Sequence, residues 1–288
     1  MADWLLLRLP RTLQEHATWL VVDARGAAVG PPQGGPLSLA APRAAGRHVV
    51  VLVPGTEVLL AQPELPPAKA GARLQQLVAY ALEEQLAEDI DELHFAIGRR
   101  HGDSARVPVA VVARRLMDEW TTLLKSSGLE PEALYADSEL LPQNPGQAIA
   151  LLDGDAVVVR PPSGTVSTLP VDARDEALEI ALGGVEPGTP GGRGLVLYTG
   201  AAEWQRHAPA VEAARERFEG IQIQLLTGGP LTLFAQQLPA TAATNLLQGP
   251  YAAAPSHPVG WNAWRLAAIL LAGFIALHVA GKIAELTV

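Results

Sequence analysis

The side chains most able to do chemistry form an acidic cluster in one short segment. The sequence LEEQLAEDIDELH, residues 82–94, carries six carboxylates, and no Lys or Arg occurs between Leu74 and Gly98. The six residues are Glu83, Glu84, Glu88, Asp89, Asp91 and Glu92. Carboxylates at this density can ligate a metal, exchange protons with a substrate or attract a basic partner.

The spacing of the cluster narrows these possibilities. An EF-hand loop that began at Asp89 would need glycine at its sixth position and a carboxylate at its twelfth. Those positions hold His94 and Arg100, which excludes the motif. A different metal site could use Asp89, Asp91 and His94, and paired carboxylates could serve acid–base catalysis. Our first interpretation of the cluster is a solvated helix face and loop, and our second is a surface that docks a basic partner. We expect His94 to be a hydrogen-bonded, half-buried residue of a strand.

The motifs of several common enzyme classes do not occur in this sequence. There is no G-x-x-x-x-G-K-[ST] loop, which excludes a P-loop ATPase, and no G-x-S-x-G nucleophile elbow. The seven histidines form no H-E-x-x-H pair. Without cysteine, disulfides, thiolate catalysis and cysteine–zinc sites are excluded as well. We therefore assign no catalytic, metal-binding or cofactor-binding residue, and we expect no enzyme activity.

The composition indicates a protein with a substantial core and no nucleic-acid partner. The chain has 288 residues, 49% of them apolar, and a net charge of −9. A phosphate backbone requires a basic face, which this charge disfavours. The first ten residues, MADWLLLRLP, lack a basic leader and do not form a signal peptide. We expect the first ~260 residues to be cytoplasmic on that ground.

The C-terminal run of apolar residues predicts a membrane anchor. Between Arg265 and Lys282 there are sixteen positions without an ionised side chain, slightly short of the about 17–25 that a span needs. Snorkelling of Lys282 would lengthen the stretch, so we expect a transmembrane helix at 263–284. The expected anchoring residues are Trp261, Trp264, Leu266, Ile269, Leu270, Phe274, Ile275 and Leu277. The alternative is a terminal helix packed on the core of the chain or on a partner.

Hydrophobic patterns predict alternating strands and helices before that run. Apolar residues recur with helical spacing at Leu74, Leu77, Val78, Ala81 and Leu82. The predicted strands of the first half lie within residues 4–9, 18–30, 48–65, 93–100 and 107–113, with a turn at Asp23–Gly26 and a helix at 114–128 that ends near Gly128.

A second unit begins near Gly146. Residues 147–171 predict a strand meander with turns at Asp153-Gly154 and Ser163-Gly164. Asp172 is expected to cap a following helix. The predicted elements after it are a strand–helix–strand unit within 194–226, which favours parallel neighbours, and a closing helix at 229–238.

Three segments resemble the L component of the bacterial type II secretion system. They are LVAYALEEQLAEDIDELHF (77–95), TNLLQGPYA (244–252) and WNAWRLAAILL (261–271). The resemblance implies an α/β fold, with a two-lobed actin-like and RNase H-like cytoplasmic region followed by a single transmembrane helix. The implied parts are a first lobe with an inserted subdomain at 1–145, a second lobe at 146–240, a juxtamembrane linker at 241–262 and the membrane helix at 263–284.

The same resemblance implies a function and partners. Proteins of this family recruit the assembly ATPase, the E component, to the bacterial inner membrane. The M component, and possibly the F component, are the implied membrane partners, and we expect a homodimer. The six carboxylates are then candidates for docking. The resemblance also implies a small periplasmic domain. The residues after Glu285 are too few to form it.

An actin-like lobe raises the alternative of a nucleotide-binding protein like the M proteins of pilus assembly. Asp153-Gly154-Asp155 stands where a phosphate-binding hairpin would be, but Arg160 and two prolines replace small hydroxyl-bearing residues. At the adenosine element, Gly200 is followed by Ala201 instead of a second glycine, and Trp204 adds bulk. These departures favour a fold that hydrolyses no nucleotide.

Overall fold

A computed structural model of the chain describes most of the residues before Ala253. The described residues are 3–11, 16–66, 72–100, 104–144, 146–162, 165–170, 194–213, 215, 218 and 220–252. The expected membrane helix at 263–284 with its anchoring residues, the turn at Ser163-Gly164 and the helix after Asp172 lie outside them. Among the helices that are described, none has the length and apolar character needed to cross a bilayer.

The first sheet has five strands in the order β3-β2-β1-β4-β8. They are β1 (Trp4–Arg8), β2 (Ala17–Val22), β3 (Gln33–Gly35), β4 (His48–Val53) and β8 (Ala133–Ala136). β1, β2 and β3 pair antiparallel, whereas β4 is parallel to both β1 and β8. The predicted turn after β2 is confirmed. The Asp23 carboxylate accepts hydrogen bonds from the backbone of Arg25 and Ala27, and Gly26 takes a φ of 80°.

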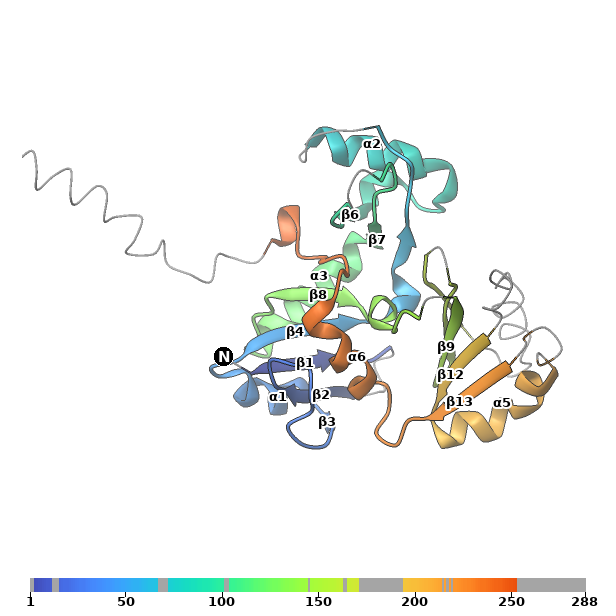
Figure 1. Ribbon diagram of the computed structural model, residues 1–288. Helices are drawn as coiled ribbons and strands as arrows, with labels where there is room; N and C mark the ends of the chain where they lie inside the picture. Colours follow the sequence, from blue (N-terminus) through green and yellow to red (C-terminus); the bar gives the residue numbers. More distant parts are fainter. Residues whose placement is uncertain are drawn as a thin grey trace, which may run out of the picture. The chain divides into compact units, whose positions relative to one another are not determined.

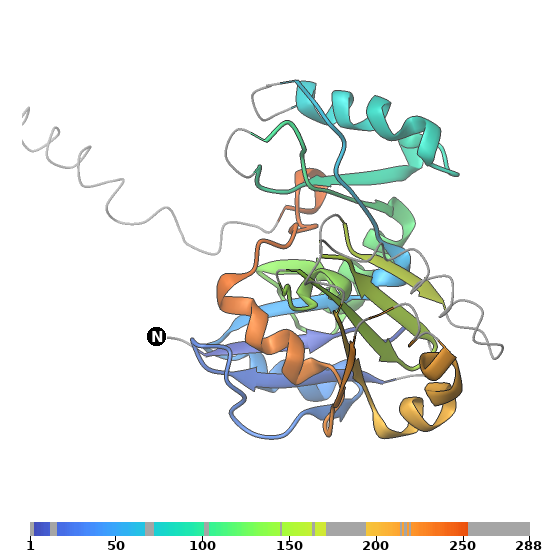
Figure 2. The ribbon, with the colours of Figure 1, turned by 45° about the vertical axis from the view of Figure 1, so that its right-hand side comes forward.

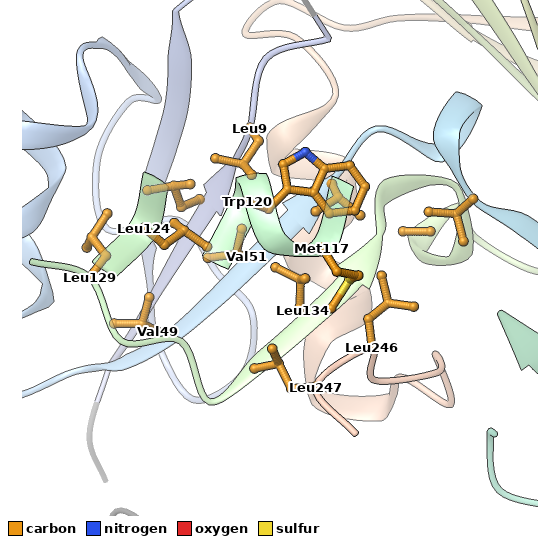
Figure 3. Packing of buried hydrophobic residues seen from close by; sticks show 14 of the residues in the cluster. Leu9, Val49, Val51, Met117, Trp120, Leu124, Leu129, Leu134, Leu246 and Leu247 are labelled. Carbon is orange, nitrogen blue, oxygen red and sulfur yellow. The ribbon is translucent and has the colours of Figure 1, made fainter. Parts of the chain in front are cut away.

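Helices cover both faces of this sheet, which explains why its strands are almost continuously apolar. They are α1 (Leu37–Ala44), α3 (Arg114–Ser126) and α6 (Leu231–Gln237). α1 and α3 pack on one face and α6 on the other (Figure 1). Met117, Trp120 and Leu124 are the buried residues of α3, and they share one cluster with Leu246 and Leu247 (Figure 3).

The second sheet repeats the connectivity of the first. Its strands are β9 (Gln147–Asp153), β10 (Ala156–Arg160), β11 (Ser167–Pro170), β12 (Gly194–Thr199) and β13 (Gly220–Leu225), in the order β11-β10-β9-β12-β13. Three strands again form an antiparallel meander and two follow in parallel. The helix α5 (Ala201–Ala213) connects β12 to β13, so the predicted parallel unit is confirmed.

A small antiparallel sheet is inserted between β4 and α3. Its strands are β5 (Leu59–Ala61), β6 (Leu93–Ile97) and β7 (Val109–Ala113), in the order β5-β7-β6. The helix α2 (Ala72–Leu82) packs against it through Leu74, Val78 and Leu82, as the helical spacing predicted (Figure 2). We call this part, residues 59–113, the inserted subdomain.

Short 3₁₀ turns connect several of these elements. They are η1 (Gly55–Glu57), η2 (Glu83–Gln85), η3 (Ile90–Glu92), η4 (Asp137–Leu140), η6 (Leu238–Ala240) and η7 (Gly249–Tyr251). η1 and η4 follow β4 and β8 at the same end of two adjacent parallel strands, which brings their polar groups together.

Candidate functional site

The Asp153-Gly154-Asp155 hairpin of the second sheet meets two arginines, one on β1 and one shortly after it. The hairpin connects β9 to β10, and Gly154 takes a φ of 61°. The Asp153 carboxylate pairs with the guanidinium of Arg8 at 2.6 Å and with that of Arg11 at 2.9 Å. The backbone carbonyl of Asp153 also accepts a hydrogen bond from Arg11. We call Arg8, Arg11, Asp137, Asp153 and Asp155 the intersheet ion network.

The centre of the network is a buried carboxylate. Asp137 in η4 is 1% exposed, and it accepts hydrogen bonds from Arg8 at 2.6 and 2.9 Å and from the backbone N–H of Gly55 at 2.8 Å. Arg8 also lies over the ring of Phe234, 5.6 Å from its centroid. Burial opposes the charge of Arg8, but Asp137 and Asp153 outweigh it and raise the pKa of the guanidinium.

Glycine at position 55 is required by the close packing around this carboxylate. A Cβ at Gly55 would lie 2.6 Å from the hydroxyl oxygen of Ser138 and 2.8 Å from Asp137.

The single guanidinium of Arg8 joins β1 to η4 and to β9. The site thereby holds the two sheets together. Of its residues, only those of the Asp153–Asp155 hairpin were candidates from the sequence alone.

The six carboxylates predicted for docking lie on the inserted subdomain, on η2, η3 and the loop between them. We call them the acidic surface, and all six are exposed. The Asp89 carboxylate caps η3 by accepting a hydrogen bond from Asp91 N at 2.9 Å. Within the described part of the chain, no three His, Cys, Asp or Glu side chains are placed to hold a metal ion. Their exposure leaves the carboxylates available to another molecule.

An apolar groove of ≈ 540 Å³ borders the acidic surface. Glu88 and Leu86 form part of its wall together with Arg115 of α3. Apolar side chains contribute much of the remaining lining, namely Val58, Leu59, Leu60, Leu93, Val111, Val112, Leu116, Val166 and Leu169. Arg115 is distant in sequence from the acidic segment, so the local absence of basic residues gave no indication of this neighbour.

A second, polar cleft of ≈ 600 Å³ contains the half-buried Glu139 and Arg160. Burial raises the pKa of Glu139 to about 7, although hydrogen bonds from Thr244 and the charge of Arg160 act against this shift. Burial also lowers the pKa of Arg160, while Glu139 opposes this effect. Sequence reasoning missed Glu139, since a single carboxylate in a short turn carries no motif.

The TNLLQGPYA segment is packed against the first sheet and the inserted subdomain. Leu246 donates its backbone N–H to the carbonyl of Leu134 on β8 at 2.8 Å, and it is fully buried. The Gln248 amide group bonds to both the N–H and the carbonyl of Ile97 on β6. Residues 244–251 are therefore part of the folded unit, because their leucines and amides contribute to the core and to the edge of β6.

His94 of the inserted subdomain holds the same segment through Leu246 and Tyr251. The imidazole of His94 is hydrogen-bonded to the carbonyl of Leu246 at 2.8 Å, and the ring of Tyr251 meets it edge-on at 5.0 Å. Burial lowers the pKa of His94, which favours its neutral form. The predicted hydrogen bond of His94 is confirmed, and at 5% exposure the residue is more deeply buried than expected.

Comparison with known proteins identifies the family. A model of the family described as type II secretion system (T2SS), protein L, matches residues 5–254. This chain belongs to that family. The relationship confirms the resemblance carried by the acidic segment and by TNLLQGPYA, and it makes this L-family chain a component of the type II secretion system.

Each match to a relative covers a larger share of this L-family chain than of the relative. The type II secretion system protein L of Pectobacterium carotovorum is 33% identical over 164 residues, which are 56% of this chain and 38% of the relative. The Vibrio cholerae protein L is 28% identical over 235 residues, 81% of this chain and 53% of the relative. The chain thus spans about half the length of these relatives, or less.

Solved structures show the same mixed α/β fold. The cytoplasmic domain of EpsL, an inner membrane component of the type II secretion system of Vibrio cholerae, matches with a TM-score of 0.62 and 22% identity. The match covers 87% of this L-family chain and all of the solved domain. A PilM–PilN type IV pilus biogenesis complex matches with a TM-score of 0.54 and 14% identity over 83% of this chain and 98% of the solved chain.

Proposed function

We propose that this chain is an adaptor that recruits the assembly ATPase of the type II secretion system, the E component, to the inner membrane. The single observation that carries the proposal is the acidic surface beside an apolar groove on the inserted subdomain. A docking site needs an apolar floor that excludes water and a polar rim that selects the partner. Glu88 belongs to both parts, since it lies in the acidic segment and lines the groove.

The charges and the groove contribute differently to such a complex. Exposed rim charges mainly raise the association rate and make it depend on salt. Burial of apolar side chains in the groove would supply affinity that salt affects less. A basic patch that presents an apolar side chain to the groove would satisfy both features.

The experiment measures binding of the E component to the full chain in membranes. Reversal of Glu83, Glu84 and Glu88 to Lys should weaken binding, and the loss should be larger at low salt than at high salt. The control reverses Glu130, Glu132 and Glu212, which changes the net charge equally at exposed positions elsewhere on the chain. Unchanged affinity and salt dependence in a folded triple variant would remove the acidic surface from the interface.

We propose that residues 263–284 anchor the adaptor as one inner-membrane helix, with the region before it in the cytoplasm. Its apolar character all round supports this proposal. The proposed partners in the membrane are the M component and possibly the F component. A charge at the centre of such a helix costs about 2.5–3.5 kcal/mol on insertion scales. Leu271→Arg should therefore shift the chain toward the soluble fraction after a high-salt wash, whereas Leu271→Ala should stay in membranes.

The proposed lobes keep the boundaries expected from the sequence, residues 1–145 and 146–240. Of the expected linker 241–262, residues 241–252 would complete the folded unit and the remainder would lead to the membrane. Limited proteolysis with mass spectrometry tests this division. Early cleavage near 145 and after 252 would support it, and early cleavage within β9 or β12 would contradict it.

The intersheet ion network supports an adaptor without ATP turnover. Arg8 and Arg11 bind the hairpin at which an actin-like protein would bind phosphate, so a nucleotide would have to break paired charges first. The pilus-assembly M type of nucleotide binder remains the alternative. The full chain should hydrolyse ATP no faster than buffer does. Turnover that disappears in Asp153→Ala would instead favour that alternative.

A further inference from the structure

The apolar groove beside the acidic surface carries charges of both signs. Of the charged side chains that line it, Glu57 and Glu88 are acidic and Arg115 is basic. All three are exposed. Glu88 belongs to the loop between η2 and η3 of the inserted subdomain, whereas Arg115 lies in the first turn of α3. The acidic surface therefore accounts for only one of the two signs that an occupant of the groove would meet.

Arg115 is not neutralised by the chain around it. Among the described residues it forms no ion pair, neither with Glu88 of the same groove nor with Glu119 one turn later on α3. The first turn of α3 contains no acidic residue. The neighbouring Arg114 differs, because its guanidinium donates a hydrogen bond to the carbonyl of Leu93. Arg114 thus fastens α3 to β6, while the charge of Arg115 is available to another molecule.

The apolar lining of the groove makes it a place from which a partner would exclude water. Leu59 lines it and is 44% exposed although it is a large apolar residue, whereas Val58 and Leu93 are buried. A segment that fills the groove removes water from Leu59, which is favourable. It also removes water from Arg115, which is unfavourable unless the guanidinium gains a partner. The occupant must therefore bring an acceptor for Arg115.

A purely basic occupant does not meet this requirement. Its charges would satisfy Glu88 but would oppose Arg115, and like charges that meet across an interface are strongly unfavourable. A carboxylate is the group that fits best, because it accepts two parallel hydrogen bonds from the planar guanidinium. The charges of the groove are thus complementary to a segment that carries both signs.

We propose that the docked segment of the E component is an apolar stretch with a basic and an acidic side chain, which binds Glu88 through the first and Arg115 through the second. This inference rests on the proposed function, because it names the chemistry of the segment that is recruited at this groove. Two charges of opposite sign on different elements fix the register and direction of the segment. Arg115 thereby determines specificity, while the acidic surface raises the association rate.

Reversal of Arg115 distinguishes this partner from a purely basic one by the sign of the effect. Arg115→Glu makes the groove more acidic, so it would tighten the binding of a purely basic segment. For the proposed segment it should weaken binding of the E component to the full chain in membranes by about tenfold, mainly through faster dissociation. An acidic residue in the first turn is favourable for α3, so the helix should remain folded. Arg43→Glu, at an exposed position on α1, is the control and should leave the dissociation rate unchanged.

A charge-conserving swap tests the arrangement of the charges apart from their sum. Glu88→Arg combined with Arg115→Glu keeps the net charge at −9 and exchanges the two signs within the groove, so it should also speed dissociation. Arg115→Lys keeps the positive charge and should retain most of the affinity. Circular dichroism checks that each variant is folded. An unchanged or tighter complex with Arg115→Glu, or a swap variant that dissociates like the natural chain, would overturn the inference.

The same measurements separate this inference from the proposed function. If reversal of Glu83, Glu84 and Glu88 weakens binding while Arg115→Glu does not, the acidic surface recruits the E component and the acidic side chain of the segment is wrong. If neither set of variants changes binding, the E component docks elsewhere and both proposals are wrong.

Discussion

The intersheet ion network and the acidic surface use the same type of side chain, the carboxylate, in opposite ways. In the network, the carboxylate of Asp137 is 1% exposed and accepts hydrogen bonds from Arg8 and Gly55. On the acidic surface, Glu83 and Glu84 are exposed on a short turn. Removing a buried partner leaves an uncompensated charge, whereas an exposed charge remains solvated. A buried, paired carboxylate therefore cannot lose its partner without destabilising the fold, whereas exposed carboxylates are available to another molecule.

The largest expected effect comes from breaking the network at its shared cation. Arg8→Ala leaves Asp137 and Asp153 without the guanidinium that bridges them, and the loss of a buried partner typically costs about 3–5 kcal/mol. Urea unfolding of the full chain in detergent measures the change in the free energy of unfolding. Arg106→Ala is the control, because its pair with Glu64 is exposed at both ends and should be worth about 0–1 kcal/mol. Equal effects of the two variants would contradict the contrast between buried and exposed pairs.

Glu139 is an intermediate case, since it is half-buried beside Arg160 and has a pKa raised to about 7 from its ordinary value of 4.5. Between these values the folded chain holds a proton that the unfolded chain has released. The free energy of unfolding should therefore fall as pH rises from 4.5 to 7.

Replacement of this carboxyl should remove the pH dependence that it causes. Glu139→Gln keeps an oxygen that can accept the Thr244 N–H, so the variant should gain up to about 3 kcal/mol over the natural chain at pH 8, with the gain vanishing toward pH 4. Unfolding curves at several pH values check this. A Gln variant with the same pH slope as the natural chain would show that Glu139 is ionised without penalty.

The smallest expected effect on stability belongs to the acidic surface. Neutralising Glu83, Glu84 and Glu88 to Gln should change the free energy of unfolding by no more than about 0.5 kcal/mol per residue. The same variant should lower the binding rate of the E component at low salt, since it removes steering charges. A large loss of stability would assign these residues to the fold instead of to a partner.

Much of the fold could be predicted because local patterns encode it. The helix α2 follows from the spacing of Leu74, Val78 and Leu82, and the parallel unit of β12, α5 and β13 follows from a strand–helix–strand pattern. The family was evident from short segments as well.

The contacts between residues that are distant in sequence could not be predicted from local patterns. Arg8 and Asp137 are 129 residues apart, and they meet because β1, β4 and β8 are adjacent parallel strands. Leu246 looked like part of a linker, yet it completes the core beside Leu134.

The sequence by itself determined most of the elements, their order and the position of the acidic segment, because these depend on periodicity and composition within a few turns of chain; β3 and α1 were not predicted. Only the tertiary structure decided which charges are paired. Asp153 became part of a buried network through Arg8 and Arg11, while Glu88 stayed exposed at the edge of a groove that also contains Arg115. The physical reason is that burial and partner choice depend on strand order and register, which bring together residues that no local pattern relates.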